Sequence, residues 1–261
     1  MPVVYVLLLS LLVYATPVFA GRALLVERVA VPPVIDGRAD DAAWSPARKT
    51  AVRDVVADID IRLQAVHDGD RIYLLVRFPD ADENRLHRQL VWNPVLKSYE
   101  DGPTREDCLV LKWSMVPQET NLTLKENRPY QADIWFWKAH RTDHAGFADD
   151  KVQYYTTTRD KKAKLLISSE GNVFYLQRLG DQGQPAYQPL LPVTYSGDQV
   201  AKYEQTTPSG SRADVRAKGV WWQGEWTVEF SRKLDTGHSD DVRFRLDGRY
   251  PFGVSRYEIA G

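Results

Sequence analysis

The segment around residues 67–70 is the strongest constraint on how this chain can fold. Two alternating runs, IDIRLQAV at 59–66 and RIYLLVRF at 71–78, flank the turn His67-Asp68-Gly69-Asp70. An Asp-Gly pair between such runs predicts a β-hairpin, because glycine readily adopts the positive φ that a tight turn needs. We therefore expect two antiparallel strands here, each with one face toward a core.

A second hairpin is predicted where GVWW and EWTVEF flank Gln223-Gly224. In its second strand Trp226, Val228 and Phe230 share one face, because side chains alternate along a strand. Further strands are expected near 23–31, 107–115, 132–139, 163–169, 172–178 and 242–247. Only residues 80–92 suggest a short helix, and 179–215, rich in Gly, Pro, Gln and Ser, is expected to be a long loop. Many short strands without interleaved helices predict an all-β fold, an antiparallel β-sandwich with long loops and little helix.

The N-terminal residues form a targeting segment. VVYVLLLSLLVYATPVFA is apolar from Val3 and ends in Val18-Phe19-Ala20, a small-x-small pattern typical of a cleavage site. We expect a signal peptide over 1–20 and one domain over 21–261, so the mature protein is predicted to be periplasmic or otherwise exported. No Lys or Arg precedes the apolar run, which leaves a retained anchor as the alternative. No other stretch is suited to spanning a bilayer, so no transmembrane span is expected in the mature chain.

Composition and motifs argue against several functions. Lysine plus arginine, 34, balances aspartate plus glutamate, 35, so no basic surface for nucleic acid is expected. The single cysteine, Cys108, excludes an intrachain disulfide and a covalent c-type haem. The chain lacks G-x-S-x-G and a phosphate-binding glycine loop, so we do not predict an enzyme. Asp149 and Asp150 could bind calcium, but no calcium-loop motif surrounds them, so they are expected in a solvated turn.

Met115 is the only methionine after the initiator. In a strand over 107–115 it shares the apolar face of Leu109, Leu111 and Trp113. Two interpretations stay open for it. Methionine readily fills gaps in a core, and its thioether is also suited to be an axial ligand of haem iron.

Lys138 lies in the stretch DIWFWKAHRT, where alternation places it with Ile134 and Phe136 and opposite Trp135 and Trp137. Its stem can lie along apolar surface while the ammonium reaches water. Alternatively, burial lowers the pKa of the amine, which then offers a neutral lone pair to a metal.

Several stretches in order carry a resemblance to a known family. IDGRADDAAW is similar to the opening of sandwich domains related to family 9 carbohydrate-binding modules. AVHDGDRIYLLVRFPDAD, REDCLVLKW, DIWFWKAHRT with GFADD, and KGVWWQGEWTVEFSRKL resemble the haem-binding domain of the ethylbenzene dehydrogenase γ-subunit family. Together they span about 34 to 234. GRYPFGVSRYE extends the resemblance nearly to the end of the sequence.

The resemblance implies a β-sandwich that holds one non-covalent haem b between a methionine and a lysine. It further implies a non-catalytic subunit that exchanges electrons with iron–sulfur and molybdenum oxidoreductase subunits or with another periplasmic electron carrier. Met115 matches the position of the family's methionine. The lysine is Lys138 or Lys233, and the inward facing of Lys138 favours it.

The same resemblance suggests roles for neighbouring residues. Arg232 falls on the inward face of its strand and is a candidate partner for a haem propionate, with a surface or loop salt bridge as the alternative. Trp113, Trp135 and Trp137 are candidate walls of the haem pocket or ordinary core residues.

The rival function is a carbohydrate- or ligand-binding module without redox chemistry. Flat aromatic faces of Trp135, Trp137, Trp221 or Trp222 would stack on sugar rings if they were exposed. Orientation discriminates the two functions, because exposed adjacent tryptophans favour glycan, whereas a closed apolar pocket that ends in Met115 favours haem.

Overall fold

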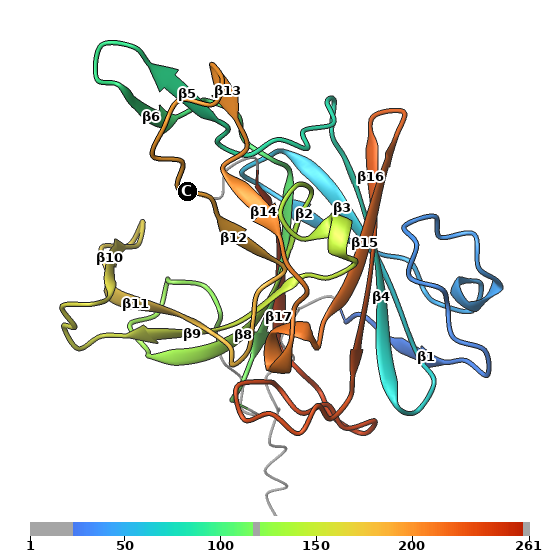
Figure 1. The fold of residues 1–261 in the computed structure, drawn as a ribbon. Coiled ribbons are helices and arrows are strands. Elements are labelled where there is room, and N and C mark those ends of the chain that lie inside the picture. Colours follow the sequence, from blue (N-terminus) through green and yellow to red (C-terminus); the bar gives the residue numbers. More distant parts are fainter. Residues whose placement is uncertain (1–22, 117–120, 258–261) are drawn as a thin grey trace, which may run out of the picture.

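Two six-stranded sheets form the body of the protein (Figure 1). The computed structural model describes residues 23–116 and 121–257. The first sheet contains β1 (Val26–Arg28), β2 (Thr50–Asp54), β3 (Ile59–His67), β4 (Arg71–Pro79), β15 (Arg216–Trp222) and β16 (Glu225–Lys233). Its order is β1-β3-β4-β16-β15, and β2 also pairs with β3.

The second sheet carries most of the residues singled out from the sequence. It contains β7 (Cys108–Ser114), β8 (Tyr130–Lys138), β9 (Asp149–Thr156), β10 (Lys164–Ile167), β11 (Val173–Gly180) and β17 (Phe252–Tyr257). The order is β10-β11-β9-β8-β7-β17, and every neighbouring pair is antiparallel. The one parallel pairing among the described strands is β1 with β3.

Short elements decorate the two sheets. One small sheet consists of β5 (Leu90–Asn93), β6 (Ser98–Asp101) and β13 (Gln199–Val200), and another of β12 (Tyr187–Pro189) and β14 (Tyr203–Gln205). The described helical turns are the 3₁₀ turns η1 (Ala42–Trp44), η2 (Asp143–Ala145) and η3 (Gly210–Ala213). The all-β fold is therefore confirmed. Among the described residues, no helix has the length and apolar character needed to cross a membrane.

Both predicted hairpins are confirmed. β3 pairs antiparallel with β4 around Gly69, whose φ is 104°. β15 pairs with β16 around Gln223 and Gly224, whose φ values of 48° and 84° are both positive, as a type I′ turn requires. This turn twists in the same sense as the strands it joins, which explains why a two-residue loop suffices.

The main core lies between the two sheets. From the first sheet, Trp226, Val228 and Phe230 point inward, as alternation predicted, together with Leu63 and Leu74. The second sheet contributes Leu109, Leu111, Trp113, Trp135 and Trp137. Each such side chain contributes about 1.5–3 kcal/mol when it is fully buried, so this aromatic-rich layer is what holds the sheets together.

Two predicted elements are wrong, and the predicted loop over 179–215 contains the short strands β12, β13 and β14 and the turn η3. Residues 80–92 form no helix; the segment is extended and leads into β5. Asn84 forms hydrogen bonds with Asp107 in place of helical ones. The Asn84 N–H donates to the Asp107 carboxylate at 2.8 Å, and the Asp107 N–H donates to the Asn84 carbonyl at 2.9 Å. Residues 242–247 form no strand, although Val242 and Phe244 are buried against the core. The predicted signal segment lies outside the described residues.

Candidate functional site

Met115 lies just beyond the end of β7, where the chain bends. Its backbone N–H donates to the Gln131 carbonyl at 3.2 Å, which extends the β7–β8 ladder by one step. The side chain is half-buried, whereas Trp113 of the same predicted stripe is buried in the core. The strand itself follows the expected alternation, but Met115 has left it.

Lys138, at the end of β8, is 1% exposed. Its ammonium forms an ion pair with the Asp149 carboxylate and donates to the Tyr187 hydroxyl at 2.7 Å. Tyr187 in turn donates to the same carboxylate at 3.0 Å, and the ammonium lies over the Phe136 ring, 4.6 Å from its centroid. The stem therefore does not extend to water, because the charge is matched inside the protein.

The structure does not bring Met115 and Lys138, the predicted ligand pair, together. Met115 is level with Gln131 of β8, and Lys138 lies seven residues farther along that strand. At about 3.3 Å per residue this is a separation of roughly 23 Å between their backbones. Two axial ligands of one iron, each bonded at roughly 2 Å, must lie within roughly 5 Å of each other.

The three tryptophans named from the sequence pack in the sandwich core. Trp113 contacts Trp135 with ring centroids 5.2 Å apart, and Trp137 meets Trp226 edge-on at 4.9 Å. The Trp137 indole N–H also donates to Asp143 at 2.8 Å. These rings contact one another and fill the space between the sheets. In this structure the three tryptophans are therefore core residues and do not line a haem pocket.

Arg232 faces inward on β16, as predicted, and is completely buried. Its guanidinium pairs with the Asp133 carboxylate and donates to the Val242 carbonyl, under the rings of Trp135 and Phe244. Arg232 is thus matched by buried carboxylates between the sheets, Asp133 of β8 and, at 3.5 Å, Asp241 of the loop between β16 and β17. Lys233, the other candidate amine, is exposed at the end of β16 in the first sheet.

The face of the second sheet that points away from the core holds a set of residues that sequence reasoning identified only in part. We call it the outer lysine face and define it by Val110, Lys112, Ile134, Phe136, Lys138 and Lys151. Lys112, Ile134 and Lys151 form one row across β7, β8 and β9. The alternation of β7 and β8 indicated most of this face, but β9 was not predicted, so its lysine was not placed.

Lys112 has the most apolar surroundings of the charged groups on this face. Its ammonium lies 4.7 and 4.1 Å from the ring centroids of Tyr130 and Tyr155. It donates to the Tyr130 hydroxyl at 2.6 Å and to the Leu122 carbonyl at 3.1 Å. Burial lowers the pKa of this amine to about 8.

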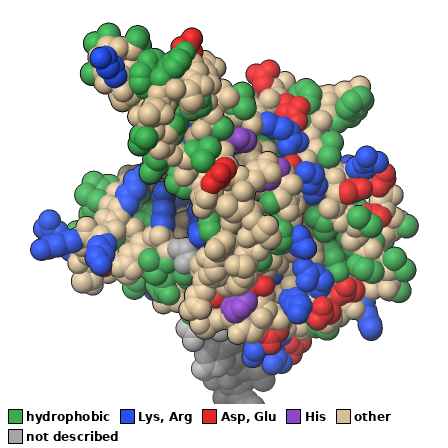
Figure 2. Space-filling model, viewed as in Figure 1, with side chains coloured by type: hydrophobic (Ala, Val, Ile, Leu, Met, Phe, Trp, Pro, Cys, Tyr) green, Lys and Arg blue, Asp and Glu red, His purple; other side chains and the backbone are tan. Residues whose placement is uncertain are grey.

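The outer lysine face lies beside a hollow. On the side of the molecule seen in Figure 2, the surface is hollowed between the arm formed by β9, β10 and β11 and the segment of β12 and β14, and Lys or Arg side chains are visible inside it. Half-buried Val110, Phe136 and Leu166 pack against the buried Ile134 cluster here. The second sheet therefore presents an apolar floor with cationic groups around it.

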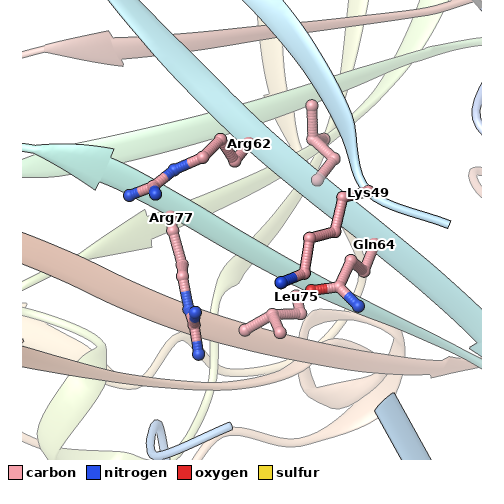
Figure 3. Close-up of a pocket in the computed structure, with 6 residues that line it drawn as sticks. Lys49, Arg62, Gln64, Leu75 and Arg77 are labelled. Atoms are coloured by element: carbon pink, nitrogen blue, oxygen red, sulfur yellow. The ribbon is translucent and has the colours of Figure 1, made fainter. Parts of the chain in front are cut away.

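Two shallow pockets lie elsewhere, on the outer face of the first sheet. One is lined by Lys49, Arg62, Leu63, Gln64, Leu75 and Arg77 (Figure 3). Arg62 and Arg77 are directly opposed on β3 and β4. The other pocket includes Arg38, Trp222 and Glu225. Trp222, a candidate for stacking on sugar, therefore lines the second pocket, whereas none of the candidate haem-site residues lines either pocket.

Comparison with known proteins supports the resemblance noted in the sequence. The family model described as ethylbenzene dehydrogenase matches residues 41–259. No curated protein matches the chain. The matched region includes both sheets from β2 onward and every site residue discussed above. The chain belongs to the ethylbenzene dehydrogenase family.

Proposed function

We propose that this chain is an exported electron-transfer protein that carries haem b, serves a molybdenum oxidoreductase and does not itself catalyse that enzyme's reaction. Membership of the ethylbenzene dehydrogenase family supports a role in such an enzyme complex. An iron–sulfur subunit, or another periplasmic electron carrier, is the partner that this role requires. Haem, when bound, supplies a centre that accepts and releases single electrons.

The observation that carries the proposal is the chemistry of the outer lysine face. A haem needs flat apolar surface for its macrocycle, cations for its two propionates and donor atoms for its iron. Half-buried Val110 and Phe136 supply the apolar surface, Lys151 supplies a cation, and Lys112, across Ile134 from Lys151, supplies an amine. The interior of the sandwich offers no comparable set, because its aromatic rings are in mutual contact.

Lys112 is the amine best suited to the iron. Lys138 and Lys151 both pair with the Asp149 carboxylate, whereas Lys112 contacts a hydroxyl, a carbonyl and two aromatic rings. An amine must lose its proton to donate a lone pair, and an ion pair with a carboxylate opposes that loss. Met115 remains the proposed sulfur ligand, because it supplies the one thioether of the described chain. It lies three residues from Lys112, roughly 10 Å between backbones at about 3.3 Å per residue, which two long side chains can bridge to one iron.

The experiment is an absorption spectrum of purified protein after expression with added haem, recorded oxidised and dithionite-reduced. A Soret band with sharp α and β bands on reduction is expected. Met115→Ala and Lys112→Met should each shift these bands, and Lys233→Met, at an exposed site on the other sheet, should leave them unchanged. If Lys138→Met shifts the bands and Lys112→Met does not, the iron ligand is Lys138, the lysine favoured from the sequence.

Absence of any Soret band after haem supply, in protein that is folded by circular dichroism, would overturn the proposal. A band that survives both Met115→Ala and Lys112→Met unchanged would keep the carrier role but refute these two ligands. Export is tested separately, by fractionation of expressing cells and mass spectrometry of the mature N-terminus. A periplasmic chain that begins at Gly21 is the expected product.

One observation favours a second candidate, the binding of a carbohydrate. Trp135 and Trp137 are buried and unavailable to a sugar, but Trp222 is 71% exposed and lines a pocket with Arg38 and Glu225. An exposed indole next to polar groups is suited to stacking on a sugar ring. Calorimetric binding of an oligosaccharide that Trp222→Ala abolishes would support this candidate, and no binding across a glycan panel would reject it.

A further inference from the structure

Two adjacent aspartates in β9 lie on opposite faces of the second sheet. Asp149 points outward to Lys138, while Asp150 is paired in register with Trp135 and shares its inward face. The expectation that both lie in a solvated turn is therefore wrong, since they are 3% and 0% exposed. Asp149 is matched by lysines, and Asp150 faces a different environment.

Asp150 belongs to a buried group of carboxylates between the sheets. Side-chain oxygens of Asp133, Asp150 and Asp241 lie within 4.8 Å of one another. They come from β8, from β9 and from the connection between β16 and β17. A fourth buried carboxylate, Asp181, follows β11 and interacts electrostatically with Asp133, Asp150 and Asp241. The group thus joins four separate segments of the chain.

The carboxylate of Asp150 is buried without a hydrogen-bond partner. Neither of its oxygens has one within the part of the chain that the structure describes, and the same holds for Asp133 Oδ1. The other oxygen of Asp133 accepts from the Arg232 guanidinium and from the Val242 N–H. Leaving a buried charged oxygen unsatisfied is costly, so a missing partner is expected among these oxygens.

The charges of this group do not balance. Arg232 is the cation in contact, bound to Asp133 and 3.5 Å from Asp241, and it offsets one of four negative charges. A second cation bound here would offset the remaining negative charge.

We propose that Asp133, Asp150 and Asp241 bind one hard divalent cation, of which Ca²⁺ is the best match, with Asp181 at the edge of the site. All donors are carboxylate oxygens, and Ca²⁺ accepts six to eight oxygens in irregular geometry, whereas Mg²⁺ demands a regular octahedron. Bound there, the ion tightens the contact between β8, β9 and the β16–β17 connection. This site is separate from the outer lysine face and does not depend on haem.

The test uses purified protein treated with EDTA, desalted and then titrated with CaCl₂ or MgCl₂ while the thermal midpoint is followed. At a hundredfold excess over the dissociation constant, Ca²⁺ should raise the midpoint by roughly 5 to 10 °C. Elemental analysis after desalting from Ca²⁺ should find one ion per chain. Mg²⁺ should give a smaller shift.

Asp150→Asn separates ion binding from simple charge relief. In EDTA the variant should be as stable as the parent or more so, because an amide replaces a buried carboxylate, yet its Ca²⁺-dependent shift should disappear. Asp247→Asn, at an exposed position, should retain the full shift. If Asp150→Asn does not fold, Tb³⁺ luminescence on the parent protein serves instead, since Trp135 is the register partner of Asp150 and can sensitise the ion.

No thermal shift, no retained ion and no Ca²⁺-displaceable Tb³⁺ emission would overturn the proposal. Retention of the Ca²⁺ shift by Asp150→Asn would equally refute the ligand set.

Discussion

Gly219 of β15 offers a sharp test of how the two sheets are packed. A Cβ atom placed on this glycine would lie 2.4 Å from Cζ2 and 2.9 Å from Cε2 of Trp137. Trp137 is completely buried, and its indole N–H bonds Asp143 at 2.8 Å, so the ring has little freedom to move. The Gly219 N–H also donates to Asp143, at 2.6 Å. Gly219→Ala therefore forces β15 away from Trp137 of β8, although both are bonded to the Asp143 carboxylate.

The magnitude follows from three contributions. Overpacking of a well-filled core costs about 1–3 kcal/mol. Weakening the bond between Trp137 and Asp143 adds about 1 kcal/mol. Removing a glycine from a strand recovers about 0.5–1 kcal/mol. The free energy of unfolding should therefore fall by about 2 kcal/mol, which lowers the thermal midpoint by about 4 to 8 °C.

Urea denaturation and thermal unfolding, both followed by tryptophan fluorescence, measure this loss. Gly253→Ala is the matched control, because Gly253 also lies in a strand but a Cβ there meets nothing within 4 Å. The control should be as stable as the parent or slightly more so. Equal stability of Gly219→Ala and Gly253→Ala would refute the close packing of β15 on the Trp137 ring.

Three further predictions concern buried polar groups. Arg232→Met should lower the free energy of unfolding by about 3–5 kcal/mol in urea titrations, because it leaves Asp133 buried without its cation; a loss below 1 kcal/mol would show that Asp133 is already protonated. Burial raises the pKa of Asp107 to about 6, above its unfolded value near 3.9. The protonated Asp107 side chain therefore stabilises the fold fully at pH values below 3.9, and this stabilisation is lost as the pH rises through 6. Asp107→Asn should accordingly flatten the fall in stability between pH 4 and 7, and an unchanged slope in parallel melts would contradict this. Cys108 is fully buried, and burial raises the pKa of its thiol, so iodoacetamide should label it only after unfolding, as mass spectrometry can verify.

Local sequence rules were enough for much of the fold. Alternation around Gly69 and around Gln223-Gly224 specified two hairpins and the inward face of β16, because side-chain direction in a strand has a period of two. The same rule placed Trp135 and Trp137 on one face of β8 and Lys138 on the other. The ordered blocks also indicated the family, which the match over residues 41–259 confirms.

Alternation fails where long-range contacts replace regular pairing. Residues 80–92 have a pattern compatible with a helix, but the backbone N–H and carbonyl of Asn84 are hydrogen-bonded to Asp107, which holds the segment extended. β9 begins with three charged residues, DDK, and only its partners β8 and β11 make it a strand. Because such pairing depends on residues distant in sequence, no local pattern reveals it.

The sequence by itself determined which residues face which side of each strand, since that depends only on alternation. Only the tertiary structure decided which of these residues meet, because register and strand order set distances between elements. Thus Met115 and Lys138 carry suitable donor atoms yet lie roughly 23 Å apart along β8 at about 3.3 Å per residue. Conversely, Asp133, Asp150 and Asp241 are distant in sequence, and folding places their carboxylates within 4.8 Å of one another between the sheets.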